Sequence, residues 1–503
     1  MAAAPLLLWL GLLLAGCAGL PARQQDKVAA DAPAAAAAQP TTLMRLADAQ
    51  AAWQPAGHSG FRLLIDPQDA LDARMQLIDA AERTLDLQYY IFKDDALGQA
   101  LVQALARAAA RGVRVRLLVD DLYAQDCFLA PLAALPGVQV RLFNPLPARE
   151  GGTVGRVLAS LHEFKRINHR MHNKLLLADD RFSVSGGRNI GTEYFMQSMQ
   201  SNFIDLDVLG LGPVVHGQTQ SFERYWFSAH TFALAQFEPT RRCAGGDTLV
   251  PGPIDRPRDA APALLQPEAL AQFTWGPARV LADDPSKIMR ESMQARFAGS
   301  VSEQALATLD TARERVVIVT PYFIPGEAGL SIMARARQRG VTTIVVTNSL
   351  GSTDEPIVHA GYARYRKPML EQGVTIYEVS PVLSRRLHQF GNFGRSQARL
   401  HSKMALVDQR WFYVGSMNLD ARSASLNTEA GLIIDSPELV RRFLDVAGPD
   451  RFSGAYEVRL APDGTLRWLE LDGQTVHTRE PDAGWLYALF NWLVPALLDE
   501  ELL

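Results

Sequence analysis

The stretch HNKLLLADD, His172 to Asp180, places polar side chains at both ends of a short apolar run. Residues 175–178 are Leu-Leu-Leu-Ala, which predicts a buried β-strand. Because alternate residues of a strand share one face, His172 and Lys174 are expected to point into the same space. One such stretch leaves two interpretations open: a structural histidine beside a solvated lysine, or two basic groups that meet in a site.

The same pattern returns in the stretch HSKMALVDQ, residues 401–409. In both copies the histidine is followed by a lysine two residues later, an aspartate seven, a glycine 14 and an asparagine 17 residues later. A carboxylate residue also lies eight residues before a proline in each copy. Chance does not repeat so many polar and glycine positions in register. The matched pairs are His172 and His401, Lys174 and Lys403, Asp179 and Asp408, Gly186 and Gly415, Asn189 and Asn418, and Asp205 and Glu429.

Segments upstream of the two motifs correspond as well. LDLQYYIFKDD (85–95) and VVIVTPYFIPGE (316–327) are each followed by a helical pattern that ends in Arg-Gly-Val. A period of about 230 residues is too long for a solenoid and predicts a duplicated domain. Within each half, apolar strands alternate with amphipathic helices, which predicts an α/β fold with two sandwich repeats.

The length of 503 residues allows two or three domains with a large core, and 48% hydrophobic with 21% charged residues is ordinary for a globular protein. The predicted divisions are a signal peptide (1–17), an Ala/Pro-rich tether (18–45), a first repeat (46–242), a Gly/Pro-rich linker (243–268), a second repeat (269–450) and a C-terminal part with a hairpin and an apolar segment (451–503).

The C-terminal part departs from the repeat pattern. LRWLELDGQTVHTRE (466–480) predicts a β-hairpin with Asp-Gly at its turn. WLYALFNWLVPALL (485–498) is short and strongly apolar. The sequence leaves open whether this segment packs on the second repeat or faces a membrane with its aromatic side chains at the lipid interface.

The N-terminus reads as an export signal, because an apolar run ends in the small residues Leu14-Ala15-Gly16-Cys17. This ending resembles the bacterial lipobox, which implies cleavage before Cys17 and acylation of that cysteine. The protein is therefore expected in the bacterial cell envelope, lipid-anchored and facing the periplasm. An uncleaved anchor is the alternative, although its 19 apolar residues are barely enough to span a bilayer.

The net charge of −4 argues against a dedicated nucleic-acid binder, which usually presents a basic face to phosphates. Cys127 and Cys243 remain after Cys17, and the sequence does not decide whether they pair. No His/Cys cluster suggests zinc, so neither a metal nor a cofactor is predicted.

The doubled motif identifies the family that this chain resembles. The pattern H-x-K-x4-D followed by Gly-Gly/Ser-x-Asn, present twice between residues 55 and 440, is the signature of the phospholipase D superfamily. The NHRMHNK surroundings of the first copy and the lipobox look like the bacterial cardiolipin synthase branch, C type. The resemblance implies two phospholipase D-like α/β sandwiches that are related by a pseudo-twofold axis and share one active site, so that a monomer suffices.

Phosphodiester chemistry independently requires these residue types. Attack on a charged phosphodiester needs a nucleophile, cations around the phosphoryl oxygens and an acid for the leaving group. Two histidines, with ordinary pKa values near about 6.5, can divide the nucleophile and acid roles at neutral pH. Two lysines supply positive charge without a metal.

The resemblance assigns the individual roles. His172 would attack phosphorus to form a phosphohistidine, and His401 would protonate the leaving alkoxide and later activate the incoming hydroxyl. Asp205 and Glu429 would orient the imidazoles. Asp179 and Asp408 complete the motifs, either in catalysis or by holding the turn after each strand. The expected phosphate-binding residues are Lys174, Lys403, Asn189, Asn418 and Ser416, the last of which replaces Gly187 of the first copy.

The acceptor remains open at this stage. Transfer of a phosphatidyl group to phosphatidylglycerol would make cardiolipin, with phosphatidylethanolamine as another candidate lipid substrate, whereas transfer to water would make the protein a phospholipase D. Phospholipids are the expected partners in either case, and a nuclease or a non-enzymatic lipoprotein is disfavoured.

Overall fold

The computed structural model describes residues 19–22, 39–239, 243, 266–386, 390–448, 453–471 and 474–484. The predicted signal peptide with Cys17, most of the tether and linker, and the apolar segment 485–498 lie outside the described residues. Among the described helices, none combines the length and the apolarity needed to cross a membrane.

The first repeat forms a mixed β-sheet in the order β1-β8-β6-β5-β2-β3-β4-β9. The strands β2, β3 and β4 are mutually parallel, and the other neighbours are antiparallel. The motif strand predicted over residues 175–178 is β5. The bounds are β1 (His58–Leu64), β2 (Thr84–Tyr89), β3 (Arg114–Asp120), β4 (Val138–Phe143), β5 (Leu175–Ala178), β6 (Phe182–Gly186), β8 (Asp207–Leu211) and β9 (Thr231–Ala233).

The second repeat has the same strand order, β10-β17-β16-β15-β11-β12-β13-β18, and continues into β19 and β20. Antiparallel pairing of β1 with β10 joins the two sheets. The bounds are β10 (Thr274–Ala282), β11 (Arg315–Val319), β12 (Thr342–Asn348), β13 (Thr375–Val379), β15 (Met404–Val407), β16 (Trp411–Gly415), β17 (Ala430–Asp435), β18 (Ala455–Leu460), β19 (Leu466–Glu470) and β20 (Val476–His477).

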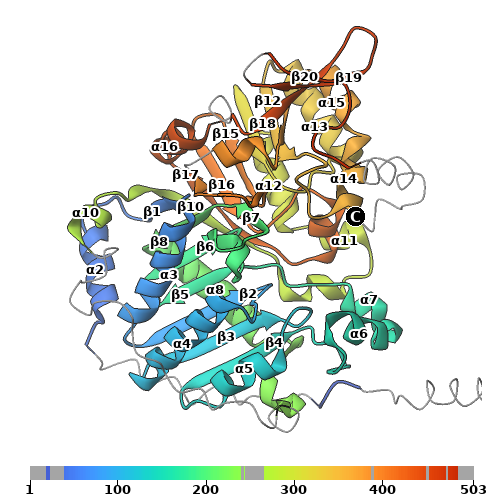
Figure 1. Cartoon of the computed structure of the whole chain (residues 1–503). Coiled ribbons are helices and arrows are strands. Elements are labelled where there is room, and N and C mark those ends of the chain that lie inside the picture. The colour runs from blue at the N-terminus through green and yellow to red at the C-terminus, as the bar shows by residue number, and fades with distance from the viewer. Residues whose placement is uncertain are drawn as a thin grey trace, which may run out of the picture.

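The matching strand order confirms the predicted α/β fold with two repeats. Figure 1 shows the first repeat in blue and green and the second in yellow to red, with the strands of both meeting in the middle of the molecule. Antiparallel β19 and β20 occupy the region predicted to form a hairpin. Cys127 and Cys243 are joined by a disulfide, which answers the question that the sequence left open.

Helices cover the faces of the sheets, and the ends of two helices explain the recurring Arg-Gly-Val. Gly112 follows α4 (Ala96–Ala110) with φ of 91°, and Gly340 follows α13 (Gly326–Gln338) with φ of 79°. Only glycine adopts this left-handed conformation without strain, so the residue recurs where each helix turns into the next strand. The helices of the first repeat are α2 (Thr42–Ala51), α3 (Pro67–Ala80), α4 (Ala96–Ala110), α5 (Asp126–Ala133), α6 (Gly152–Ala159), α7 (Phe164–Ile167) and α8 (Pro213–Trp226).

The second repeat carries helices in corresponding places, with a shorter α12 where the first repeat has α3. Its helices are α10 (Pro267–Leu270), α11 (Met293–Phe297), α12 (Val301–Leu309), α13 (Gly326–Gln338), α14 (Pro356–Ala363), α15 (Arg366–Glu371) and α16 (Pro437–Ala447). Short helical turns complete the fold at η1 (Leu161–Glu163), η2 (Thr192–Phe195), η3 (Leu234–Phe237), η5 (Pro285–Met289), η6 (Leu383–Arg386) and the π-helical η8 (Arg422–Leu426).

In the part of the chain that the structure describes, three hydrophobic clusters hold these layers together. One lies under the helices of the first repeat and another under those of the second. The third lies between the repeats, where Phe61 and Leu175 of the first pack in one cluster with Leu406 and Phe412 of the second. This shared core fixes the two repeats against each other.

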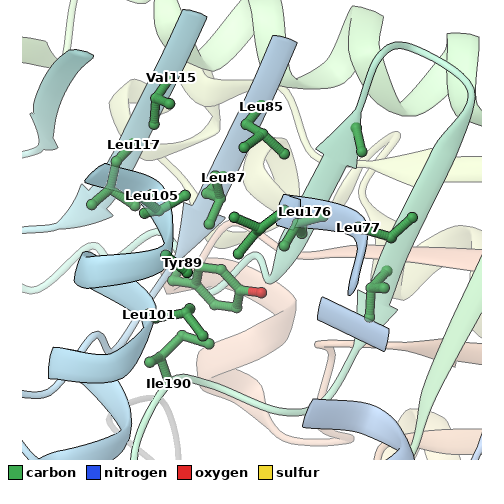
Figure 2. Packing of buried hydrophobic residues seen from close by; sticks show 14 of the residues in the cluster. Leu77, Leu85, Leu87, Tyr89, Leu101, Leu105, Val115, Leu117, Leu176 and Ile190 are labelled. Atoms are coloured by element: carbon green, nitrogen blue, oxygen red, sulfur yellow. The ribbon is translucent and has the colours of Figure 1, made fainter. Parts of the chain in front are cut away.

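The first cluster allows a direct test of the core. Leu87 of β2 is fully buried among leucines of the neighbouring strands (Figure 2). Leu87→Ala should lower the free energy of unfolding by about 2–5 kcal/mol, because it removes packed methyl groups and leaves a cavity. The matched substitution Leu158→Ala, at a side chain that is 62% exposed, should change it by about 0.5 kcal/mol or less. Urea unfolding measures both, and equal effects would contradict the packing.

Candidate active site

Two short pairings bring each histidine segment next to the carboxylate segment of the opposite repeat. β14 (Gln397–Leu400) pairs in parallel with β7 (Ser201–Ile204), directly before His401 and Asp205. The amide of His401 donates to the carbonyl of Ile204 at 2.8 Å. In the reciprocal pairing, Met171 bridges Thr428, and the amide of His172 donates to the carbonyl of Thr428 at 2.9 Å. Each repeat therefore places its histidine next to the carboxylate of the other repeat, at one interface.

The result is two crossed histidine–carboxylate pairs, in which the imidazole belongs to one repeat and the carboxylate to the other. Nδ1 of His172 lies 2.9 Å from Oε2 of Glu429, and Nδ1 of His401 lies 2.6 Å from Oδ2 of Asp205. An ionised carboxylate only accepts hydrogen bonds, so each ring donates from Nδ1 and directs the lone pair of Nε2 away from its carboxylate. The sequence predicted that these acids orient the imidazoles. It did not show that each acid serves the histidine of the other repeat.

Aromatic rings form walls beside both imidazoles. The ring of Tyr90 meets that of His172 edge-on at a centroid distance of 5.0 Å. Tyr194 and Phe203 approach the ring of His401 at 5.2 and 4.8 Å. Neither Tyr194 nor Phe203 was predicted from the sequence, although Tyr194 lies only five residues after Asn189. These rings limit access of water to the histidines, which are 7% and 5% exposed.

Each lysine folds back onto its own motif. Nζ of Lys174 donates to the carbonyl of His172, and Nζ of Lys403 to that of His401, both at 2.5 Å. The two ammonium groups are buried, and that of Lys174 also lies 5.4 Å from the centroid of the Tyr90 ring. The identical bonds follow from the shared i, i+2 spacing.

The pKa values show that the four basic groups occupy one low-dielectric space. Burial lowers the pKa of His172 to about 4, and the positive charges of Lys174 and Lys403 add to this effect although Glu429 opposes it. Burial also lowers the pKa of Lys403 to about 8 and, with help from Lys403, holds that of Lys174 well below its usual value. Because Lys403 acts on groups of the first repeat, both motifs face the same site.

The remaining site groups follow the same pattern. Burial and the charge of Lys403 lower the pKa of His401. Burial alone would raise the pKa values of Glu429 and Asp205, but the histidines and lysines outweigh it and hold both below their usual values. The carboxylates therefore stay ionised beside four buried basic groups, whose charged forms a bound anion would stabilise.

The structure assigns Ser416 to Glu429. The hydroxyl of Ser416 donates to Oε2 of Glu429, and that of Ser423 donates to Oε1 at 2.9 Å. The phosphate contact that the sequence predicts for Ser416 stays a prediction, and in the structure this hydroxyl donates its proton to the carboxylate that holds His172. The first repeat has no room for an equivalent serine, because a Cβ on Gly187 would lie 2.1 Å from Oδ1 of Asp205.

The two asparagines of the motifs differ. Asn189 accepts a hydrogen bond from the amide of Ile91 at 3.2 Å and donates to the hydroxyl of Tyr194 at 2.9 Å. The side-chain oxygen of Asn418 is buried and has no partner among the described residues. Of the two asparagines, Asn418 is therefore the one whose side-chain oxygen can accept a hydrogen bond from a ligand.

Asp179 and Asp408 hold backbone rather than imidazole. Asp179 accepts hydrogen bonds from the amides of residues 82, 83 and 84, at the start of β2. Asp408 accepts from residues 313, 314 and 315, at the start of β11. Of the two interpretations from the sequence, these contacts favour the structural one over a catalytic role.

The described residues contain one cluster with metal-ligand chemistry, His359, Glu378 and Glu480. Its centre is taken by the guanidinium of Arg366, which bonds to Nε2 of His359 at 3.0 Å, to Glu378 at 2.7 Å and to Glu480. This buried cation stabilises the second repeat in place of a metal, and the cluster lies outside the histidine site.

Comparisons with known proteins identify the relatives of this chain. The profile of the family described as "Cardiolipin synthase, PLD-like domain" matches residues 75–226 and 305–447. "Cardiolipin synthase C" of Escherichia coli (strain K12) is 36% identical over 436 residues, which cover 83% of this chain and 90% of that relative. "Cardiolipin synthase B" of Salmonella typhi is 29% identical and covers 74% of this chain and 76% of that relative.

A solved structure shows the same fold at low sequence similarity. The phosphatidylserine synthase of Haemophilus influenzae Rd KW20 superposes with a TM-score of 0.56 at 12% identity, covering 88% of this chain and 95% of that one. The likeness extends over both repeats and therefore includes the paired arrangement.

The structural interpretation of Asp179 gives a test with a matched control. Asp179→Ala should lower the free energy of unfolding by about 3 kcal/mol, because three amides lose their acceptor. Asp180→Ala shares the positive φ but removes only one exposed hydrogen bond, and should cost about 1 kcal/mol or less. Turnover per folded molecule should stay within about twofold of the wild type in both variants. A loss of turnover in folded Asp179→Ala would restore its catalytic assignment.

Proposed function

The chain belongs to the phospholipase D superfamily through its two cardiolipin synthase-type domains, and from this premise we propose that it makes cardiolipin from two molecules of phosphatidylglycerol. Phosphatidylethanolamine is a second candidate substrate. The observation that carries the proposal is the pair of crossed histidine–carboxylate contacts, which prepares two imidazoles for the same phosphodiester.

In the proposed first step, Nε2 of His172 attacks phosphorus and the bond from phosphorus to the glycerol head-group oxygen breaks. His401 protonates that oxygen, so glycerol leaves and a phosphatidyl-histidine remains. In the second step, the hydroxyl of another phosphatidylglycerol attacks phosphorus while His401 takes its proton. The nitrogen–phosphorus bond then breaks, which releases cardiolipin and restores His172.

The electrostatics support the division of roles. A pKa of about 4 keeps His172 neutral at pH 7, as a nucleophile must be. His401 must carry a proton to act as the acid, and an adjacent phosphodiester anion raises the pKa of an imidazole by favouring its charged form. The assignment of nucleophile to the first motif follows the superfamily resemblance.

Burial of the site supports transfer over hydrolysis. Because the imidazoles and lysines are nearly inaccessible, a phosphatidyl-histidine in this site would meet little bulk water. The 36% identity to a relative named cardiolipin synthase points in the same direction. Hydrolysis to phosphatidic acid is the second candidate function.

The product assay separates the two functions. Purified protein in vesicles with labelled phosphatidylglycerol should yield cardiolipin and free glycerol. His172→Ala should reduce the rate by about 10²–10⁴-fold, whereas His216→Ala, at an exposed histidine, should leave it unchanged. Phosphatidic acid as the main product would contradict transfer, and near-normal turnover of His172→Ala would contradict its role.

The pH dependence tests the lysine of the second motif. Lys403, with a pKa of about 8, is charged below that pH and loses its charge as the pH rises through it. The kcat/KM for phosphatidylglycerol should therefore fall above pH 8, since this ratio reports the free enzyme. Lys403→Arg keeps its charge and should shift the fall to higher pH. An alkaline limb that is identical in both proteins would contradict the assignment.

The N-terminal predictions complete the proposal. We infer that the signal is cleaved before Cys17, which removes residues 1–16 on export, and that acylated Cys17 anchors the protein in the cell envelope, facing the periplasm, beside its lipid substrates. Mass spectrometry of the N-terminal peptide from bacterial membranes should find a lipid-modified Cys17. Recovery of a peptide that retains Met1 would contradict this anchoring.

A further inference from the structure

The second repeat contains an apolar cavity of about 320 Å³ between β11, α12, α13 and η8. Its wall is built mainly from aliphatic and aromatic side chains, among them Leu306, Ile318, Phe323, Ile332 and Met333. Small-molecule sites begin at about this size, and dry apolar cavities of about half this volume already bind apolar ligands. The lining therefore suits a hydrocarbon rather than water.

Part of the cavity wall is polar and is linked to His172 by hydrogen bonds. Asn418 and Asp420 lie in its wall. The amide of Asn418 donates to the hydroxyl of Ser423 at 3.2 Å, and that hydroxyl donates to Glu429, the partner of His172. The side chains of Ser423 and Glu429 thus connect Asn418, whose side-chain oxygen has no partner among the described residues, to the imidazole of His172.

Asp420 is compatible with a hydrocarbon neighbour. Burial raises its pKa to about 7, so its carboxyl is protonated in about half of the molecules at neutral pH. A protonated carboxyl costs less than a carboxylate beside apolar groups.

The first repeat fills the corresponding space. The helix-end glycines, 112 and 340, align Leu101 with Gly329 of the cavity wall. Leu101 is fully buried, and Figure 2 shows it beside Tyr89 and Ile190. The first residues of β2 and β11 likewise align Leu71, which packs on the first core, with Ser302 of the cavity wall.

The cavity is therefore a property of the second copy and not of the fold. Both copies have the same strand order, yet small residues stand in the second where leucines stand in the first. The hydroxyl of Ser302 is buried without a partner among the described residues, which adds to the cost of leaving this space unpacked. Because only the second repeat loses stability in this way, we expect a ligand to fill the cavity.

We propose that this cavity holds an acyl chain of the phospholipid whose phosphate meets His172 and His401. The inference rests on the proposed function, and it makes this cavity, called the chamber below, the site that binds the lipid's acyl chain. Ala328 is exposed and belongs to the wall, so it marks the mouth through which a chain enters. Met289, which is 62% exposed, directly precedes the segment that leads into α11, and Met293 and Phe297 of α11 form part of the wall.

Two tryptophan variants of one helix test the chamber. Ala328→Trp places a large ring at the mouth, whereas Ser331→Trp places the same ring on an exposed part of α13 that is not in the wall. With long-chain phosphatidylglycerol, Ala328→Trp should lose at least about tenfold in kcat/KM, and Ser331→Trp should match the wild type. A wild-type value for Ala328→Trp would overturn the proposal.

The chain-length dependence gives a finer readout. Each methylene that enters the cavity should raise kcat/KM by about fourfold until the cavity is full, because burial of a methylene favours binding by that factor. Ser302→Leu, which restores the leucine of the first repeat, fills part of the cavity and should flatten this series. The same slope in wild type and Ser302→Leu would overturn the proposal.

A binding measurement distinguishes failure of the chamber from failure of the proposed function. Phosphatidylglycerol with a photoreactive group at the chain end should cross-link to peptides of α12 and α13 in the wild type, and far less in Ala328→Trp. This result needs no turnover, so it stands even if no cardiolipin forms, an outcome that would instead refute the proposed function. The proposal would be overturned by cross-links confined to other surfaces, or by a finding that the chain's own segment 485–498 occupies the cavity and prevents cross-linking.

Discussion

The site depends on one constraint: each imidazole is held by a carboxylate that belongs to the other repeat. Neither repeat could orient its own histidine, so the two domains must meet in a fixed relation before any chemistry is possible. The paired strands β7 and β14 and the shared core between the sheets supply that relation. Burial makes the contacts strong and also depresses the basicity of the histidines and lysines, and a bound phosphate anion would raise that basicity again.

The duplicated architecture matters most where its symmetry is broken. Ser416 supports Glu429, while Gly187 leaves room for the closer Asp205. Asn189 is committed to Ile91 and Tyr194, while the side-chain oxygen of Asn418 is unpartnered. These differences gather on the second repeat, next to its apolar cavity. The two repeats thus provide equivalent histidines and lysines for the phosphate, whereas only the second repeat provides an apolar cavity beside them for the rest of a substrate.

The sequence predicted the repeats, the fold class and the motif residues because these follow from local patterns that occur twice. It could not pair His172 with Glu429, since 257 residues separate them and only the packing of the two sheets brings them together. The bond from Ser416 to Glu429 could not be predicted, because the spacing of this serine reveals nothing about the direction of its hydroxyl. Tyr194 and Phe203 were not predicted because no sequence motif distinguishes an aromatic residue beside a histidine from one in the core. The cavity was not predicted because it results from small side chains in the second repeat, whose effect on packing depends on their neighbours in space.

The central claim is that both imidazoles address a single phosphorus atom. A crystal structure of the protein with vanadate, which adopts the geometry of a phosphoryl group under attack, tests it most directly. The account predicts one vanadate bonded to Nε2 of His172, with Nε2 of His401 within hydrogen-bond distance of the opposite apical oxygen. Vanadate bound to only one histidine with the other facing a separate space, or two anions in two pockets, would contradict it.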